Sequence, residues 1–328
     1  MGFYVPAELH CGYKNIEKKR HFQQIDLDLP APLPTHLPLK PLKTLAFPHE
    51  LTSLSDTLKR EGKSLGFVPT MGALHEGHLS LVREAKSKND VVVASIFVNP
   101  TQFNDPKDFE RYPRVVEEDQ RMLESAGCDV LFLPSVKDMY PDDASQQAVS
   151  FGFLETVLEG AHRPGHFSGV GMVVKRLFEI VKPSTAYFGS KDYQQVMVIR
   201  SLVEQFSIPV EIIAMPTIRE SDGLAMSSRN RLLSAEERTI ALALSKALFT
   251  AKENYPSQSI PELLQHAIAT LSRPDIRLEY FVICDGDTLR EITDKSQTKN
   301  PVALVAAHVG KVRLIDNLGL GRAVNSEQ

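Results

Sequence analysis

Two nearly continuous apolar runs that flank a helical pattern place the strongest constraint on how this chain can fold. Residues 65–68 read Leu-Gly-Phe-Val, and residues 91–98 are apolar almost throughout. Between them, from about residue 78 to residue 88, apolar side chains recur at the spacing of a helix with one buried face. Continuous apolar runs are typical of strands that are covered on both faces, as parallel strands are. The segment therefore predicts a strand–helix–strand unit with two parallel strands.

The alternation of strand and helix continues along most of the chain, which is the pattern of a parallel sheet with helices on both faces. The predicted strands lie at residues 65–68, 91–98, 130–133, 186–188 and 210–215. The predicted helices lie at residues 51–60, 78–88, 115–126, 170–181 and 196–204. Residues 42–216 are therefore predicted to form a domain of the α/β class, with a Rossmann-like doubly wound parallel sheet.

The pattern changes after residue 216. Ser234 and Glu237 have the S-x-x-E spacing of a capping box, which predicts a long helix that continues through residue 251. A second helix is predicted at about residues 261–271, and strands are predicted at residues 278–284, 302–308 and 312–315. Residues 217–328 are therefore predicted to form a smaller C-terminal α+β domain.

Residues 1–41 differ from the rest of the chain in composition. A basic cluster at residues 14–20 is followed by a stretch that five prolines interrupt. This composition predicts a proline-rich, poorly ordered extension. A targeting peptide is the less favoured interpretation, because transit peptides are poor in acidic residues. Acidic residues occur here at Glu8, Glu17, Asp26 and Asp28.

The charge and the cysteines of the chain argue against several classes of protein. A formal net charge of −4 over 328 residues lacks the basic excess that a nucleic-acid binder needs, so no nucleic-acid partner is expected. The three cysteines lie far apart without a C-x-x-C spacing, which argues against a disulfide framework or a thiolate zinc site. No apolar run approaches the roughly 20 residues of a membrane span. The sequence predicts a cytoplasmic protein that does not enter a membrane.

The first candidate site is the turn between the first predicted strand and its helix, residues 69–78, which read Pro-Thr-Met-Gly-Ala-Leu-His-Glu-Gly-His. Doubly wound folds bind ligands at this edge, where helix N-termini attract anions. Gly72 and Gly77 would let the backbone approach a polyphosphate, and His75 and His78 would donate to phosphate oxygens, whether neutral or charged. A surface turn with incidental histidines is the alternative. A zinc site is less favoured, because the spacing is not H-E-x-x-H and no third ligand lies nearby.

Two later strings are also candidates for phosphate binding. Residues 189–195 read Gly-Ser-Lys-Asp-Tyr-Gln-Gln and follow a short strand, so Lys191 offers a charge to phosphate and Asp192 offers an acceptor to ribose. Residues 226–230 read Met-Ser-Ser-Arg-Asn, whose hydroxyls and guanidinium suit a phosphate chain. Taken alone, each string is explained at least as well by a polar loop beside a helix.

Taken together, the histidine-rich turn and the late Ser-Ser-Arg loop resemble the HIGH and KMSKS motifs of class I synthetases and nucleotidylyltransferases. The chain is most similar to the pantothenate synthetase (pantoate–β-alanine ligase) family, from about Leu42 to the C-terminus. The strings that carry the resemblance occur in order: PTMGALHxGH, SIFVNPxQF, YPR, GxKDYQQ and MSSRN. The resemblance implies an AMP-forming ligase that uses ATP and Mg²⁺ to join pantoate to β-alanine through a pantoyl-adenylate. It also implies a homodimer.

The resemblance further implies the roles of individual residues. His78, as proton donor, His75 and Lys191 are the expected catalytic residues. Gln102 and Gln195 are expected to bind pantoate, and Gln102 also β-alanine. The expected ATP-binding residues are Met71, Gly72, Ala73, Leu74, His75, Glu76, Gly77, His78, Gly189, Ser190, Lys191, Asp192, Ile218, Met226, Ser227, Ser228 and Arg229. Ser190 departs from the family, which commonly has a glutamate or a glutamine at this position.

No metal ion held by the protein is expected. Glu118 and Asp119 are acidic candidates, but they lie on a predicted helix, where a solvated face is the favoured interpretation. No Ser-His-Asp or Cys-His arrangement is evident, which agrees with a reaction that ATP activates without a covalent protein nucleophile. Two other functions compete with the ligase. A nucleotide sensor would not need Gln102 and Gln195, and a transferase that makes a dinucleotide would need an arginine cluster for its phosphorylated partner.

Overall fold

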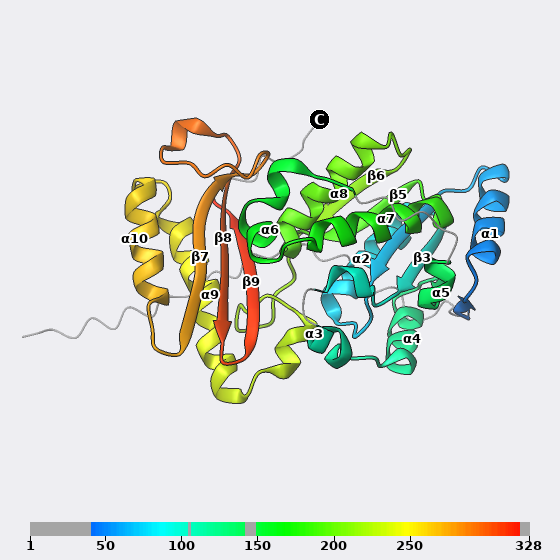
Figure 1. The fold of residues 1–328 in the computed structure, drawn as a ribbon, viewed down its shortest axis with the longest axis horizontal. Helices are drawn as coiled ribbons and strands as arrows, with labels where there is room; N and C mark the ends of the chain where they lie inside the picture. Colours follow the sequence, from blue (N-terminus) through cyan, green and yellow to red (C-terminus); the bar gives the residue numbers. More distant parts are fainter. Residues whose placement is uncertain (1–40, 104–105, 142–148, 322–328) are drawn as a thin grey trace, which may run out of the picture. The chain divides into compact units, whose positions relative to one another are not determined.

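The computed structural model describes residues 41–103, 106–141 and 149–321. The first sheet has six parallel strands in the order β1-β4-β3-β2-β5-β6 (Figure 1). Its strands are β1 (Lys43–Leu45), β2 (Leu65–Thr70), β3 (Val91–Ile96), β4 (Val130–Phe132), β5 (Thr185–Gly189) and β6 (Glu211–Met215). The predicted extension lies outside the described residues except for Pro41. Of the six strands, only β1 was not predicted.

Helices cover both faces of this sheet, as a doubly wound fold requires. The helices before residue 216 are α1 (Pro48–Arg60), α2 (Glu76–Lys88), α3 (Pro106–Arg111), α4 (Val116–Ser125), α5 (Val136–Met139), α6 (Leu158–His162), α7 (His166–Val181) and α8 (Tyr193–Gln205). Short 3-10 turns lie at Pro100–Gln102, Gly152–Glu155, Ser190–Asp192, Ser228–Leu232 and Lys295–Gln297. Helices α1, α7 and α8 pack on one face, and α2 and α4 pack on the other.

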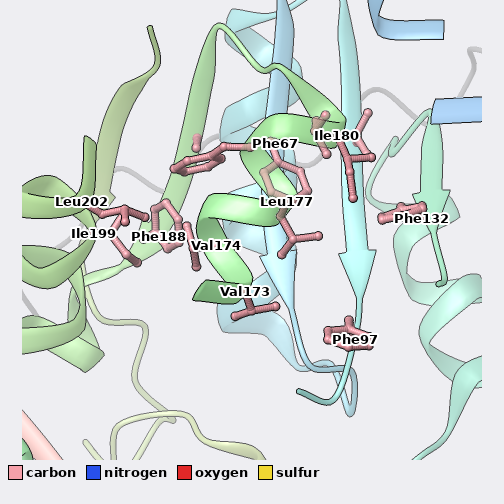
Figure 2. Packing of buried hydrophobic residues seen from close by; sticks show 14 of the residues in the cluster. Phe67, Phe97, Phe132, Val173, Val174, Leu177, Ile180, Phe188, Ile199 and Leu202 are labelled. Atoms are coloured by element: carbon pink, nitrogen blue, oxygen red, sulfur yellow. The ribbon is translucent and has the colours of Figure 1, made fainter. Parts of the chain in front are cut away.

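The two faces divide alternate residues of the central strands. Phe67 of β2 lies among the side chains of α7, whereas the next residue, Val68, packs with α2 on the opposite face. Figure 2 shows part of the first of these clusters, which contains Phe67 together with Val174 and Leu177 of α7. This alternation explains why both faces of the strand are apolar in sequence, since each successive side chain enters a different buried layer.

The C-terminal part contains an antiparallel sheet in the order β7-β8-β9, with two helices packed on one face (Figure 1). Its elements are α9 (Ala235–Asn254), α10 (Ile260–Leu271), β7 (Ile276–Asp285), β8 (Pro301–Val309) and β9 (Val312–Gly319). The capping box at α9 is present, because Ser234 Oγ accepts from Glu237 N–H at 3.1 Å. The predicted α/β fold with a smaller α+β part is therefore confirmed, while the boundary after residue 216 stays a prediction. No helix in the described ranges is both long and apolar enough to cross a membrane.

Helix α7 packs closely against the turn Pro100–Gln102, and Gly169 makes this contact possible. Asn99 Nδ2 donates to Gly169 O at 3.2 Å. A Cβ atom at Gly169 would lie 2.7 Å from the carbonyl carbon of Thr101, which is much closer than a van der Waals contact. Because the opposing group is backbone, it cannot move aside by changing a rotamer. The glycine therefore fixes how α7 sits beside Gln102.

We predict that Gly169→Ala lowers the free energy of unfolding by about 1–3 kcal/mol, the usual cost of overpacking. Alanine gains about 1 kcal/mol in helix propensity over glycine, which is too little to offset a backbone clash. Urea denaturation measures the change. Gly319→Ala is the control, since nothing lies within 4 Å of its Cβ position. A Gly169→Ala protein as stable as the wild type would contradict this account of the packing.

Candidate active site

A cavity of about 250 Å³ lies at the carboxyl edge of the parallel sheet, where Thr70 ends β2 and Gly189 ends β5. Its walls come from the turn before α2, the turn Pro100–Gln102, the start of α7 and the loop before α8. Residues 216–218, residues 226–229 and the strands β7, β8 and β9 complete it. Segments that are far apart in the sequence thus meet in one cavity, at the edge where doubly wound folds bind ligands.

Most of the predicted site residues line this cavity. Those that do so are Met71, His75, Gly77, His78, Gln102, Gly189, Lys191, Asp192, Gln195, Ile218, Met226, Ser227, Ser228 and Arg229. Those that do not are Gly72, Ala73, Leu74, Glu76 and Ser190. Residues 72–74 are buried inside the protein. Glu76 is exposed at the start of α2, where it pairs with Arg83.

Backbone N–H groups of the turn hold the rings of its two histidines in fixed orientations. His75 is the N-cap residue of α2, and its Nδ1 accepts from Gly77 N–H at 3.2 Å. The backbone N–H of His75 in turn donates to Nδ1 of His78 at 3.3 Å. The ring centroids are 4.1 Å apart. Because Nδ1 accepts a hydrogen bond in both neutral rings, Nε2 carries the hydrogen in both. Each imidazole therefore retains one N–H donor at Nε2.

Both rings are neutral at pH 7. Burial, together with the smaller effects of the nearby charges of Lys191 and Arg231, lowers the pKa of His75 to about 4. Burial also lowers the pKa of His78 to about 3, with smaller effects from His75 and Lys191. A helix N-terminus likewise disfavours a positive charge at this position. The sequence left the charge state of the two imidazoles open, and the structure favours neutral donors.

Contacts inside the protein explain why Gly72 and Gly77 are glycines. A Cβ atom at Gly72 would lie 2.9 Å from Oδ2 of Asp119, and the φ of Gly72 is +80°. A Cβ atom at Gly77 would lie 2.9 Å from the ring of His75. Both glycines thus make room for side chains that shape the turn. The sequence attributed both to the approach of a polyphosphate, whereas the structure explains Gly72 without any ligand.

The acidic pair on α4 divides into an exposed and a buried residue. The side chain of Glu118 is 47% exposed and lies 3.8 Å from Arg231. Asp119 is 1% exposed, and its carboxylate accepts hydrogen bonds from the turn before α2. The predicted solvated face is therefore wrong for Asp119, because this residue lies on the buried side of the helix with Leu123. Over the described ranges, no group of three or more His, Cys, Asp or Glu residues could hold a metal ion.

Neighbouring glutamines at the start of α8 have different surroundings. Gln194 is buried, where its Nε2 donates to Leu154 O and Val157 O at 2.7 and 3.0 Å, and its Oε1 accepts from Glu159 N–H at 3.0 Å. Gln195 is half-buried and lines the cavity. Gln194 also borders the cavity, but its amide oxygen and nitrogen are both bonded to the backbone of the segment that leads into α6.

Gln102, the other predicted glutamine, is held at the cavity wall by its neighbours. Its Oε1 accepts from Asn99 Nδ2 at 3.3 Å, and its Nε2 lies 3.0 Å from the sulfur of Met71. His166 Nδ1 lies 2.8 Å from the carbonyl oxygen of Gln102. Burial lowers the pKa of His166 to about 4, so at pH 7 the ring is neutral and donates this bond through Nδ1.

Several residues that line the cavity were not predicted from the sequence. Glu159 accepts from Tyr280 Oη and from both Nη atoms of Arg313, each at 2.7 Å, so its charge is compensated in place. Arg163 and His166 also line the cavity. Burial lowers the pKa of Arg163 to about 10, which leaves the guanidinium charged at pH 7. The string His-Arg-Pro-Gly-His at residues 162–166 could have indicated these two, whereas the partners of Glu159 come from distant strands and leave no local signal.

Strand β9 holds the loop that carries Lys191. Asn317 Nδ2 donates to the carbonyl oxygens of Ser190 and Lys191 at 2.9 and 2.8 Å. The preceding residue, Asp316, accepts two hydrogen bonds from Arg219 at 2.7 and 2.9 Å. The C-terminal sheet thus fixes both the lysine loop and the segment that leads to residues 226–229. Ser190 takes part through its backbone.

We predict that His75 and His78 stay neutral between pH 8 and pH 5, with ¹⁵N NMR signals of Nε2-protonated imidazoles. Their pKa values of about 4 and 3 lie below the usual value of about 6.5. The unfolded chain therefore binds more protons below pH 6.5, and the contribution of both rings to stability falls as the pH falls. The control is the chain in urea, where the histidines titrate near pH 6.5. Midpoints near 6.5 in the folded protein would contradict the prediction.

Comparisons with known proteins give the family. The model of the pantoate–β-alanine ligase family matches residues 43–319. A pantothenate synthetase from Bacteroides fragilis is 48% identical over 82% of this chain and 95% of its own length, and one from Phocaeicola vulgatus is 50% identical over 82% and 96%. The crystal structure of pantothenate synthetase from Thermus thermophilus is 44% identical, with a TM-score of 0.80 over 85% of this chain and all of that one. The chain belongs to the pantoate–β-alanine ligase family.

Proposed function

We propose that this chain joins pantoate to β-alanine at the expense of ATP, through a pantoyl-adenylate, and releases pyrophosphate and AMP. Family membership over most of the chain supports this reaction. A relative from Francisella tularensis, 39% identical with a TM-score of 0.70 over 85% of this chain, was solved in complex with "Beta-gamma ATP" and β-alanine. The observation that carries the proposal is the meeting of His75, His78, Lys191, Gln102 and Gln195 around one cavity.

The ATP phosphates are proposed to lie against the turn before α2 and the loops that follow β5 and β6. Both histidines would donate from Nε2, and Lys191 would supply the positive charge. Ser227 Oγ accepts from Arg229 N–H at 3.3 Å, which leaves its hydroxyl hydrogen for a phosphate oxygen. Mg²⁺ belongs to this proposal as the ion that accompanies the ATP phosphates, and so as part of the substrate.

Pantoate is proposed to lie between Gln102 and Gln195. A carboxamide offers both a donor and an acceptor, which matches the hydroxyl and carboxylate groups of a hydroxy acid. Gln102 suits this role because Asn99 and Met71 fix its amide, so little side-chain freedom remains to be lost on binding. Gln102 is proposed to contact β-alanine as well.

In the first step, a carboxylate oxygen of pantoate attacks the α-phosphorus of ATP, and the bond to the bridging oxygen breaks as pyrophosphate leaves. Neutral imidazoles stabilise the developing negative charge by hydrogen bonding, which strengthens as the charge grows. The amine of β-alanine then attacks the carbonyl carbon of the adenylate, loses a proton and expels AMP. ATP supplies the leaving group in both steps, so no covalent bond to the protein is needed. A homodimer and a cytoplasmic location remain part of the proposal.

We predict that the wild-type protein releases AMP only when pantoate, β-alanine, ATP and Mg²⁺ are all present. His78→Ala should lower pantoate-dependent exchange of pyrophosphate into ATP by about 100-fold or more, as loss of a transition-state donor does. The dissociation constant for ATP should change by less than about tenfold, since the ground state needs this donor less.

His266→Ala is the matched control, because His266 is an exposed histidine on α10 outside the cavity wall. AMP release that does not depend on β-alanine would contradict ligation. Exchange that is unchanged in His78→Ala would rule out the role of this histidine while leaving the overall reaction intact.

The paired glutamines of α8 give a further prediction. Gln195→Ala should raise the KM for pantoate about tenfold, the effect of one lost hydrogen bond, and leave stability and the KM for ATP unchanged. Gln194→Ala should instead lower the free energy of unfolding by about 1–3 kcal/mol, because buried partners lose their hydrogen bonds. Steady-state kinetics and urea denaturation of both variants test the contrast. A Gln195→Ala enzyme with the wild-type KM for pantoate would remove this residue from the binding site.

A further inference from the structure

Asp119 is a buried carboxylate whose two oxygens both bind the backbone of the turn before α2. Oδ2 accepts from Ala73 N–H at 2.9 Å, and Oδ1 accepts from Leu74 N–H at 2.8 Å. The residue is 1% exposed, although it belongs to a helix that otherwise carries its acidic side chains outward. A carboxylate is costly to bury unless such bonds satisfy it, so its presence here points to a specific contribution.

The backbone that Asp119 holds has an uncommon conformation. Gly72 and Ala73 have φ angles of +80° and +51°, and such angles are unfavourable for a residue with a side chain such as Ala73. Successive N–H groups in a turn of this kind form a concave site for an anion. In this protein the anion is the chain's own carboxylate. The close approach of Asp119 Oδ2 to the Cβ position of Gly72 shows how tightly the turn closes around it.

The turn fixed in this way leads directly into the histidine pair. Leu74 is bound from both sides, since Asp119 accepts from its N–H and Arg231 Nη2 donates to its carbonyl oxygen at 3.3 Å. The next N–H, that of His75, donates to Nδ1 of His78 and so keeps the hydrogen of that ring on Nε2. A shift of the backbone at residues 73–74 would therefore alter which nitrogen of His78 carries the hydrogen.

We infer that Asp119 is a positioning residue for the adenylation step. Its carboxylate holds the strained backbone at residues 72–74, and through that backbone it sets the orientation of His75 and the tautomer of His78. This inference rests on the proposed role of the two histidines at the ATP phosphates. It assigns to Asp119 no contact with substrate.

The test is the Asp119→Asn variant, which keeps the size of the side chain but turns one acceptor oxygen into an amide that faces an N–H group. The kcat of pantoate-dependent pyrophosphate exchange should fall by about 10- to 100-fold, as small misplacements of catalytic groups do. The KM for ATP should change by less than about threefold. ¹⁵N NMR of the free protein should report loss of the single Nε2-protonated form of His78.

Glu117→Gln is the matched control, an acid-to-amide change at an exposed residue of the same helix that lies outside the cavity wall, and its kcat should stay within about twofold of the wild type. If Asp119→Asn does not fold, Asp119→Glu, which keeps the charge but displaces the oxygens, is measured by the same assays. An unchanged kcat and an unchanged tautomer would overturn the inference. Recovery of kcat by higher Mg²⁺ would also overturn it, since Asp119 would then act as a metal ligand.

The NMR measurement separates this inference from the proposed function, because it needs no substrate. If the wild-type protein lacked pantoate-dependent exchange, the proposed reaction would fail, and the tautomer of His78 in Asp119→Asn would still report whether Asp119 positions the ring. A tautomer that is unchanged in Asp119→Asn would overturn the positioning role even if the wild-type protein were fully active.

Discussion

The backbone of the turn between β2 and α2 is committed to hydrogen bonds inside the protein, and the character of the site follows from this. The N–H groups of residues 72–74 donate to the side chains of Thr70 and Asp119, and those of His75 and Gly77 donate to imidazole rings. Other nucleotide folds offer such donors to phosphate. Here side chains of the protein occupy these donors, so in the proposed reaction the two Nε2–H groups are the donors that the turn offers to phosphate.

A pair of neutral imidazoles provides hydrogen bonds but no charge, so the positive charge of the cavity must come from other segments. Lys191 supplies part of it from the loop after β5, and Arg163 and Arg229 also line the cavity. Burial, and to a smaller extent the charge of Lys191, disfavours protonation of both histidines and so lowers their pKa. The position of this lysine depends in turn on Asn317, which binds the carbonyl oxygens of the loop. The small C-terminal sheet thus helps to fix the position of Lys191, which lies on the loop after β5 of the larger sheet.

The sequence predicted the fold class and the family, and both are confirmed, because continuous apolar runs and ordered motifs are local signals. The strands at residues 65–68 and 91–98 were recognisable since each buries both of its faces. The roles of the individual site residues stay predictions. Glu159 was not predicted because its partners, Tyr280 and Arg313, come from β7 and β9. No spacing in the sequence connects these residues.

Adjacent residues of one motif can differ in burial, because helix periodicity places them on different sides of the helix. Gln194 shares a buried stripe of α8 with Val198 and Leu202, at intervals of four residues, whereas Gln195 is turned about 100° from this stripe and is only half-buried, although both glutamines border the cavity. Asp119 likewise shares the buried side of α4 with Leu123. In both helices the polar residue on the apolar stripe binds the backbone of a neighbouring segment. A polar residue that interrupts an apolar stripe is therefore best interpreted as one whose hydrogen bonds hold the backbone of the loop beside it.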